Sequence, residues 1–132
     1  MSFQIPNEIE NDHEVIAIFG EWPNFYGAVL EDVTPSNFKN GDIVTVQFRA
    51  PINYNQSHSQ PNERVEVSLS FTDVTLSVPY NGFCKGEELY CLYIWQQPEQ
   101  QDRFTIDFEG ASPFVIEFSK LIVNYCRKLP RL

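Results

Sequence analysis

The alternation of apolar and polar residues, in one run after another, constrains the fold more than any other feature. Residues 65–71 carry an apolar side chain at every second position, and residues 74–78 resume the pattern with the opposite parity. Alternation of this kind indicates a strand with one face buried in a core. Because successive side chains of a strand point to opposite faces, the change of parity requires a backbone irregularity. The sequence therefore predicts one long strand over residues 64–78, with a bulge or bend near Thr72-Asp73.

Five further runs have the composition of strands, and turn residues separate them. Asn40-Gly41 is a strong turn signal, and Gly110 separates two alternating runs that should pair as a hairpin. The run after residue 88 is apolar on both faces, which predicts a central strand or a strand whose outer face is covered. The predicted strands span residues 25–34, 42–50, 89–96, 103–109 and 113–124.

The opening segment fits one short helix over residues 8–19. Asn7 is a candidate N-cap, and Glu10 follows three residues later, as in a capping box. Apolar residues then recur at helical spacing as far as Gly20, which suits the left-handed residue that ends many helices. Residues 15–19 alone also fit a strand, so this stretch has two interpretations.

These elements predict a single, mainly β domain of the α+β type over residues 1–132. A chain of 132 residues with 42% apolar and 14% aromatic residues can fill one core. Short connections between the strands favour antiparallel pairing, because parallel neighbours need longer crossovers. We therefore expect an antiparallel curled sheet or small sandwich of about six strands, covered or closed at one end by the short N-terminal helix.

The charge balance bears on the kind of partner. Eighteen acidic residues oppose nine basic ones, which gives a formal net charge of −9. Only Arg127, Lys128 and Arg131 gather, so the sequence disfavours nucleic acid as a ligand. An acidic surface suits a basic protein partner, because opposite fields accelerate and orient the encounter. The same charge also serves solubility alone, and both interpretations stay open.

Three features predict a cytoplasmic protein. The N-terminal residues lack the basic and apolar regions of a secretory signal. No stretch approaches 18 consecutive apolar residues, so we expect no membrane span. The cysteines Cys84, Cys91 and Cys126 are odd in number and lack C-x-x-C spacing, which predicts reduced thiols, with a Cys84–Cys91 disulfide as the alternative.

The sequence carries no recognisable catalytic apparatus. Neither the nucleophile elbow of hydrolases nor the glycine-rich phosphate loops of nucleotide enzymes occur. His13 and His58 have no metal-ligand spacing to each other or to a cysteine. A catalytic pair of Cys84 with His58 has no support beyond residue type. We therefore expect a binding protein rather than an enzyme, and predict no catalytic, cofactor-binding or metal-binding residue.

One short block resembles a known family. Residues 19–26 (FGEWPNFY) are similar to the Trp-Pro-x-Phe motif that follows a short helix in the immunity protein 50 family of bacterial polymorphic-toxin systems. Residues 67–74, and the ending with Gly110 between two strands, resemble that family in the same order and extend the likeness over most of the chain. The family usually continues the motif with His-Asp, whereas this chain has Tyr26-Gly27. The likeness therefore bears on the fold more than on any single residue.

The resemblance implies an antitoxin that binds a cognate toxin domain in the cytoplasm of the producing cell and neutralises it by occlusion. An interface of standard size would cover the active site of the toxin. A basic toxin, such as a nuclease domain, would suit the negative charge of this chain. For the motif residues Trp22, Pro23 and Phe25 we expect a structural role, in which the two rings pin the helix to the sheet and the proline fixes the turn.

Residues 80–95 are rich in Tyr and Trp, which combine apolar area with a polar group and recur in binding sites. They favour a second hypothesis, a small-molecule or carbohydrate-binding β module with an aromatic-lined surface. The oligomeric state, monomer or dimer, follows from neither hypothesis. For a protein partner we predict that exposed acids beside aromatic residues form the interface, namely Glu87, Glu88, Tyr90, Tyr93, Asp102 and Glu109.

Overall fold

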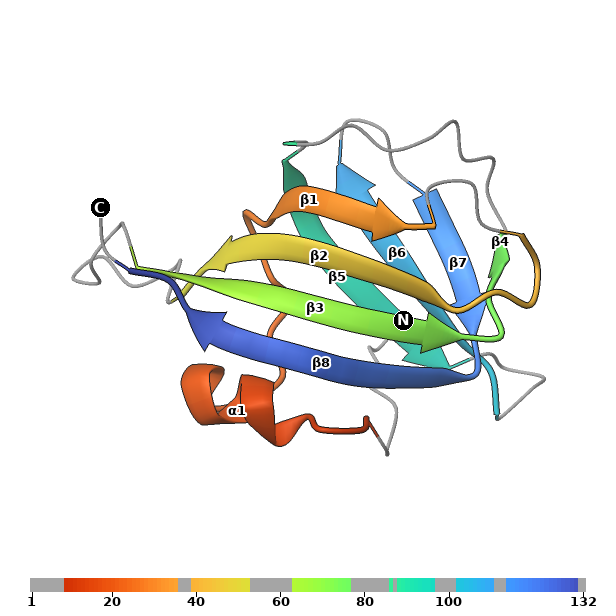
Figure 1. The fold of residues 1–132 in the computed structure, drawn as a ribbon, viewed down its shortest axis with the longest axis horizontal. Helices are drawn as coiled ribbons and strands as arrows, with labels where there is room; N and C mark the ends of the chain where they lie inside the picture. Colours follow the sequence, from red (N-terminus) through yellow and green to blue (C-terminus); the bar gives the residue numbers. More distant parts are fainter. Residues whose placement is uncertain are drawn as a thin grey trace.

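The computed structural model describes residues 9–35, 39–52, 63–76, 86, 88–96, 102–110 and 114–130, with the backbone alone at positions 90 and 91. Strands dominate this part of the chain, and one short helix precedes them (Figure 1). The elements are α1 (His13–Phe19), β1 (Val29–Thr34), β2 (Val44–Pro51), β3 (Arg64–Thr72), β4 (Thr75–Leu76), β5 (Leu89–Gln96), β6 (Phe104–Gly110), β7 (Phe114–Phe118) and β8 (Lys120–Lys128).

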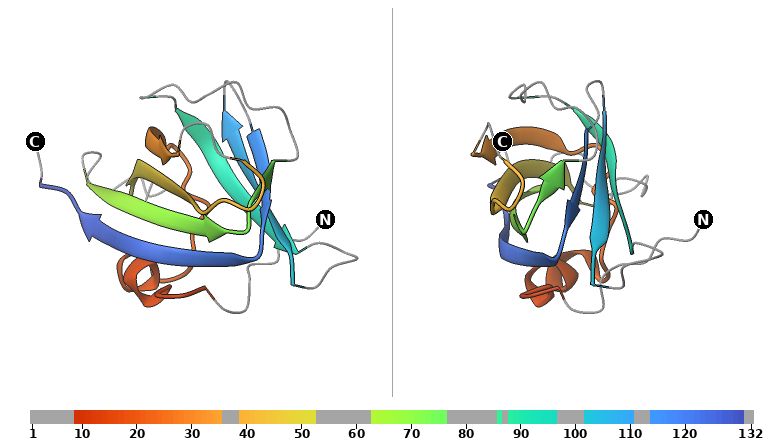
Figure 2. Two further views of the ribbon diagram at one scale, coloured as in Figure 1. Left: turned by 45° about the vertical axis from the view of Figure 1, so that its right-hand side comes forward. Right: turned by 90° about the vertical axis from the view of Figure 1, so that its right-hand side faces the viewer.

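The strands form two antiparallel sheets of four strands each, packed face to face (Figure 1). Sheet A has the order β1-β2-β3-β8, and sheet B has the order β4-β7-β6-β5. The strands of the two sheets cross steeply, and a view along the sheets shows them side by side with α1 below (Figure 2). This arrangement is a small sandwich, which confirms the predicted fold class. The described residues form eight strands rather than about six.

The chain passes between the sheets at two corners, each of which lies inside a single predicted strand. β3 ends at Thr72 in sheet A and β4 begins at Thr75 in sheet B, while Asp73 between them has a left-handed φ of 52°. The second corner is Ser119, between β7 and β8, and its backbone N–H donates to the carbonyl of Thr72 over 3.0 Å. The predicted bend near Thr72-Asp73 is confirmed. The single strand predicted over residues 113–124 is wrong, because Ser119 divides it.

Arg103 joins the two corners. Its Nη1 donates to the carbonyl oxygen of Asp73 (2.8 Å), to Asp73 Oδ2 (3.0 Å) and to Ser119 Oγ (3.0 Å), and its Nη2 donates to Thr75 Oγ1 (3.1 Å). Ser119 Oγ in turn donates to Asp73 Oδ2 over 3.2 Å. The Arg103 side chain is only 14% exposed. We call these four residues, Arg103, Asp73, Thr75 and Ser119, the corner clamp.

Side chains from both sheets fill the space between them. Phe48, Phe71, Phe108 and Phe118 are fully buried there. The ring of Phe71 in sheet A meets the rings of Phe118 and Phe108 in sheet B edge to face, at centroid distances of 4.9 and 6.2 Å. Edge-to-face contact of this kind adds to the stabilisation that burial of the rings provides. The core therefore holds the two sheets together directly.

The segment before the helix covers part of the free edge of sheet A. Glu10 forms a parallel bridge to Ile122 of β8. The N–H of Glu10 donates to the carbonyl of Leu121 (3.1 Å), and the N–H of Val123 donates to the carbonyl of Glu10 (2.8 Å). Asn11 Nδ2 adds a bond to the carbonyl of Val123 (3.3 Å). Since an unpaired edge strand invites pairing with other chains, this bridge protects β8.

The helix is shorter than predicted. α1 begins after the N-cap Asp12, because residues 9–11 belong to the bridge with β8. The predicted N-cap Asn7 lies outside the described residues, and the predicted start at residue 8 is wrong. The helix ends at Gly20 as expected, with a left-handed φ of 86°. α1 packs against β8, at the border of sheet A rather than over either face (Figure 2).

Phe25 anchors the segment after the helix in the core. It is 2% exposed, and its ring meets those of Phe19, Trp22 and Phe48 edge to face at 5.6, 5.7 and 4.9 Å. Its φ of 55° is costly for a bulky residue, and burial of the ring offsets that cost. The predicted structural role of Trp22 and Phe25 thus has a geometric basis in the contact between helix, turn and sheet A.

Residues 24–28 connect the edges of the two sheets. The N–H of Leu92 donates to the carbonyl of Asn24 (2.9 Å), and the N–H of Leu89 donates to the carbonyl of Ala28 (2.7 Å). The first strand therefore begins at Val29 and not at residue 25, as the sequence predicted. β5, predicted as a central strand or as a strand whose outer face is covered, is the last strand of sheet B and so is not central. Its apolar composition suits an edge that this segment covers.

Candidate interaction surfaces

The outer face of sheet B is acidic and aromatic. Asp107 and Glu109 on β6 alternate with core residues and face away from the core. Tyr93 on β5 stands opposite Asp107, and Glu117 on β7 lies on the same side of the sheet. Trp95 takes the next outward position of β5. We call these five side chains, all partly buried, the sheet B face.

Within the described residues, no basic side chain occupies an outward position on the strands of sheet B. Arg103 lies just before β6, but the corner clamp holds its guanidinium. The carboxylates of Asp107, Glu109 and Glu117 therefore contribute negative charge to this face that no described cation on it balances. Charge of one sign on one face attracts a partner of the opposite sign.

Asp107 and Glu109 interact directly. They lie two residues apart on one face of β6, and a side-chain hydrogen bond joins their carboxyl groups. Partial burial raises the pKa of Asp107 to about 6, with further contributions from this hydrogen bond and from the charge of Glu109. A hydrogen bond between two carboxyl groups requires one proton, because an ionised carboxylate only accepts. The surroundings of Asp107 therefore favour its protonated form more than those of an isolated aspartate do.

The outer face of sheet A has a different chemistry, with neutral hydroxyl and amide groups at its centre. Asn124 Nδ2 donates to Ser68 Oγ (3.1 Å) and to Ser70 Oγ (2.8 Å), and Ser70 Oγ lies 2.8 Å from Thr45 Oγ1. Both serines are buried, and Gln47 stands beside Ser68 in the register of the sheet. Mutual hydrogen bonding satisfies these polar groups and orders the centre of the face.

Two arginine–glutamate pairs lie on the outer face of sheet A. Arg127 Nη2 and Tyr125 Oη both donate to Glu66 Oε1, over 2.8 and 3.0 Å, and the Arg127 guanidinium lies 4.3 Å from the centre of the Tyr125 ring. The hydrogen bond from Arg127 lowers the pKa of Glu66. Arg49 Nε lies 2.8 Å from Glu31 Oε1 in an ion pair, without the alignment of a hydrogen bond. In these two pairs a basic side chain balances an acidic one, in contrast to the carboxylates of the sheet B face.

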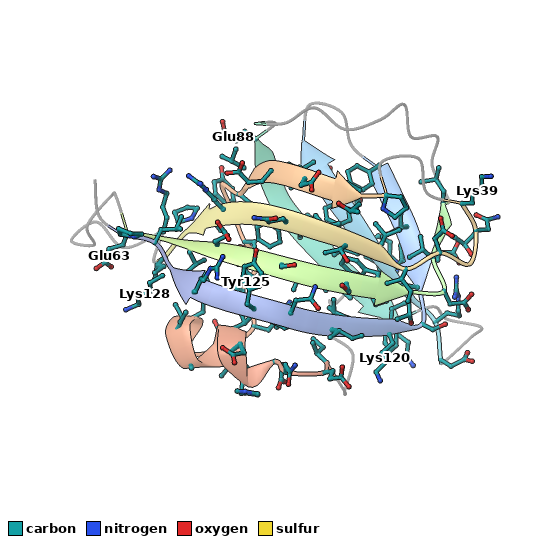
Figure 3. All side chains as sticks on the ribbon, viewed as in Figure 1. Lys39, Glu63, Glu88, Lys120, Tyr125 and Lys128 are labelled. Carbon is teal, nitrogen blue, oxygen red and sulfur yellow. The ribbon has the colours of Figure 1, made fainter. Side chains whose placement is uncertain are left out.

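The structure brings together part of the predicted interface. Tyr93 and Glu109 both lie on the sheet B face, on neighbouring strands. Glu88 is exposed at the start of β5, at the same end of the sheet as Glu109 (Figure 3). Asp102 is exposed before the start of β6, which in an antiparallel pair is the opposite end. Of the predicted residues, Tyr93 and Glu109 thus share one face, Glu88 lies at the Glu109 end of the sheet, and Asp102 lies at the opposite end.

The predicted set did not include Asp107, Glu117 and Trp95, which also lie on the sheet B face. The signal for them was present, because the alternation that turns phenylalanines toward the core also turns the residues between them outward. Following the polar positions of 104–108 and 114–118, rather than the most acidic loops, would have found both acids. Glu87 and the side chain of Tyr90 lie outside the described residues.

Groups that suit other chemistry do not converge in the described part of the chain. No three His, Cys, Asp or Glu side chains gather there as metal ligands. Cys126 faces the core, and burial raises the pKa of its thiol to about 11, so little of the reactive thiolate forms. His58 and the side chains of Cys84 and Cys91 lie outside the described residues. No helix in this part of the chain is long and apolar enough to cross a membrane.

Comparison with known proteins adds no relative. No protein-family model, curated protein or solved structure matches the chain. The resemblance of residues 19–26 to the immunity protein 50 family therefore stays a prediction. The geometry of the two sheet faces supplies the argument for function.

Proposed function

We propose that the chain is an immunity protein, a cytoplasmic antitoxin that binds a cognate bacterial toxin domain and occludes its active surface. The main support for this proposal is the sheet B face. Carboxylates and aromatic side chains lie together on this side of the sheet, and no described cation lies there. Aromatic side chains are enriched in protein interfaces, and complementary charge orients the partner. The partner is accordingly a basic toxin domain, such as a nuclease, whose phosphate-binding surface the carboxylates occupy.

The block that resembles the immunity protein 50 family supports the fold on which this proposal depends. Trp22 and Phe25 lock the turn after α1 against the core. The next connection, from Asn24 to Leu92, holds β5 in place and with it Tyr93 of the sheet B face. The motif residues thus act on the interface through the position of β5. Tyr26-Gly27, where this chain differs from the family motif, follows Asn24 in the sequence and takes no part in the Asn24–Leu92 hydrogen bond.

The test is co-expression of the chain with the toxin domain encoded beside its gene, in a sensitive bacterial host. We expect the wild type to restore growth and to co-purify with the toxin. Glu117→Lys should weaken both effects, because it reverses a charge on the sheet B face. Asp32→Lys is the matched control, since it changes the net charge by the same amount at an exposed position of sheet A. Equal loss in the two variants would place the interface elsewhere.

The electrostatic part of the proposal has its own test. At physiological ionic strength, charges are screened beyond about 8 Å. The affinity of the complex should therefore fall steadily as salt is added, and association should slow more than dissociation accelerates. An affinity that stays constant over a wide salt range would remove the basic toxin from the proposal and leave only occlusion by shape.

Tyr93 and Trp95 support a second candidate function, a carbohydrate-binding β module. They take successive outward positions of β5, about 7 Å apart along the strand. Aromatic rings at such a spacing can stack against neighbouring sugar units. Binding of soluble oligosaccharides by the wild type, lost in Trp95→Ala, together with no effect on any toxin domain, would favour this function over the first.

A further inference from the structure

Four charged side chains form a row across the outer face of sheet A, one from each strand. Arg49 of β2 stands opposite Glu66 of β3, and Glu66 stands opposite Arg127 of β8. Glu31 of β1 extends the row, since its Oε1 lies 2.8 Å from Arg49 Nε. Because neighbouring strands lie about 4.8 Å apart, the row is about 14 Å long. We call these four side chains, which alternate between acid and base, the charge row.

The contacts within the charge row fix the positions of its arginines. Arg127 Nη2 and Tyr125 Oη donate to the same oxygen of Glu66, and the Arg127 guanidinium lies 4.3 Å from the centre of the Tyr125 ring. The side chains of Arg49 and Arg127 are nevertheless 43% and 64% exposed. A guanidinium has five N–H donors, so an arginine held by one carboxylate can donate to a second. The row is therefore ordered and still able to bind charged groups of another molecule.

The order of the charges makes the row complementary to a reversed copy of itself. A two-fold axis that runs parallel to the strands, midway along the row, brings Glu31 of one copy opposite Arg127 of the other. The same rotation brings Arg49 opposite Glu66. Each contact then occurs twice, as in any two-fold dimer. A second copy thus offers opposite charge to all four side chains, whereas a partner of one charge sign would be repelled by half of them.

The rest of the face suits the same contact. Beside the charge row, Asn124 donates to Ser68 and Ser70, so the centre of the face is polar without being charged. None of the described helices or strands crosses this face, which is turned toward the viewer in Figure 1. Strand spacing and rise give the face an area of roughly 500 Å². Because this is less than the roughly 800 Å² that each partner contributes to a standard interface, the contact should be weak.

We propose that the outer face of sheet A binds a second copy of the chain, in a two-fold dimer that the charge row holds together. Sheet B lies on the other side of the sandwich (Figure 2), so the sheet B face of each copy points away from the contact. The dimer is therefore compatible with the proposed immunity function and does not depend on it. Failure of the chain to neutralise a toxin domain would leave the dimer unaffected.

Sedimentation equilibrium of the purified chain provides the first test. Wild type should pass from monomer to dimer as its concentration rises from micromolar to millimolar. Glu31→Arg and Arg127→Glu should each weaken the dimer by about tenfold or more, because each sets like charges opposite one another at two points of the interface. Glu117→Arg is the matched control, since it makes the same charge change as Glu31→Arg on the sheet B face, and it should dimerise like wild type.

The second test mixes the two weakened variants. In a dimer of one Glu31→Arg copy with one Arg127→Glu copy, position 31 of each copy again faces the opposite charge at position 127 of the other. The mixture should therefore dimerise although neither variant does so alone. Damage to the contacts within each chain cannot produce this result, because mixing does not repair those contacts.

Arg127→Gln keeps the test independent of folding, since it only removes a charge from a side chain that is 64% exposed. It should weaken the dimer less than Arg127→Glu does, with an unchanged urea unfolding transition as the check on its fold. A wild type that stays monomeric at millimolar concentration would overturn the proposal. Dimerisation of Arg127→Gln and Glu31→Arg equal to that of wild type, or a mixture of folded variants that stays monomeric, would overturn it as well.

Discussion

Replacement of Arg103 by Gln should remove the corner clamp while leaving every core side chain in place. The wild-type guanidinium donates to the carbonyl oxygen and carboxylate of Asp73, to Ser119 and to Thr75. These residues include both points at which the chain passes between sheets A and B. The guanidinium thus fixes the angle between the sheets in a way that no local strand pairing provides.

The expected loss follows from these four contacts. The Asp73 carboxylate is 67% exposed, so its ion pair with Arg103 contributes little, as is usual for exposed pairs. The bonds to the Asp73 carbonyl, to Ser119 and to Thr75 contribute about 1 kcal/mol each. Arg103→Gln should therefore lower the free energy of unfolding by about 3 kcal/mol, a large part of the roughly 5–15 kcal/mol of a typical domain.

Urea unfolding followed by tryptophan fluorescence measures this loss. Arg103→Lys keeps the charge but not the planar fork, and it should lose most of the same free energy. Arg127→Gln is the control, because Arg127 also pairs with a carboxylate but is 64% exposed at the surface of sheet A, and it should be far less destabilising. A loss below about 1 kcal/mol for Arg103→Gln, or a loss equal to that of Arg127→Gln, would refute the role of the clamp.

Three further predictions concern the core, the acidic pair and the buried thiol. Phe25→Ala should lower the free energy of unfolding by about 3–5 kcal/mol in the same assay, because it leaves a cavity in a fully packed site. Trp22→Ala removes a half-buried ring and should lower it by less. Equal losses in the two variants would contradict this ranking. Because folding raises the pKa of Asp107 from 3.8 to about 6, its contribution to stability is fully present below pH 3.8 and is lost as the pH rises through 6. The stability of Asp107→Asn relative to wild type should therefore increase by about 1 kcal/mol between pH 4 and pH 7.5. This is less than the full pKa shift implies, because solvent screens a partly exposed group. Urea unfolding midpoints at the two pH values measure the difference, and a difference that does not change with pH would contradict the prediction. Cys126 should resist alkylation at pH 8 until urea unfolds the chain, as peptide mass mapping can show, and rapid native labelling would contradict its burial.

Most of the fold could be predicted from the alternation of apolar and polar residues along the chain. The reversal of parity between Phe71 and Val74 predicted the first corner, because both side chains enter the core although Phe71 lies in sheet A and Val74 lies in the corner just before β4. Phe118 and Leu121 are also both buried and also reverse the parity, so the second corner had the same signal in the sequence. Reading that second reversal would have divided the last predicted strand at Ser119.

Features that depend on distant parts of the chain had no such signal. The helix begins late because Glu10 pairs with Leu121 and Val123, more than a hundred residues further along. The role of Arg103 depends on two corners that meet only in the folded chain. The outward direction of Asp107 followed from alternation, but its raised pKa depends on burial, which the sequence pattern does not measure.

The central claim is that the sheet B face binds a basic toxin domain, and calorimetric titration against the domain encoded beside the gene tests it most directly. Wild type, Glu117→Lys and Asp32→Lys would be compared at one pH and physiological salt. The account predicts tight binding by wild type, a loss of about tenfold or more for Glu117→Lys, equivalent to about 1.4 kcal/mol, and an affinity close to wild type for Asp32→Lys. No binding by wild type, or equal affinities for the two variants, would contradict it.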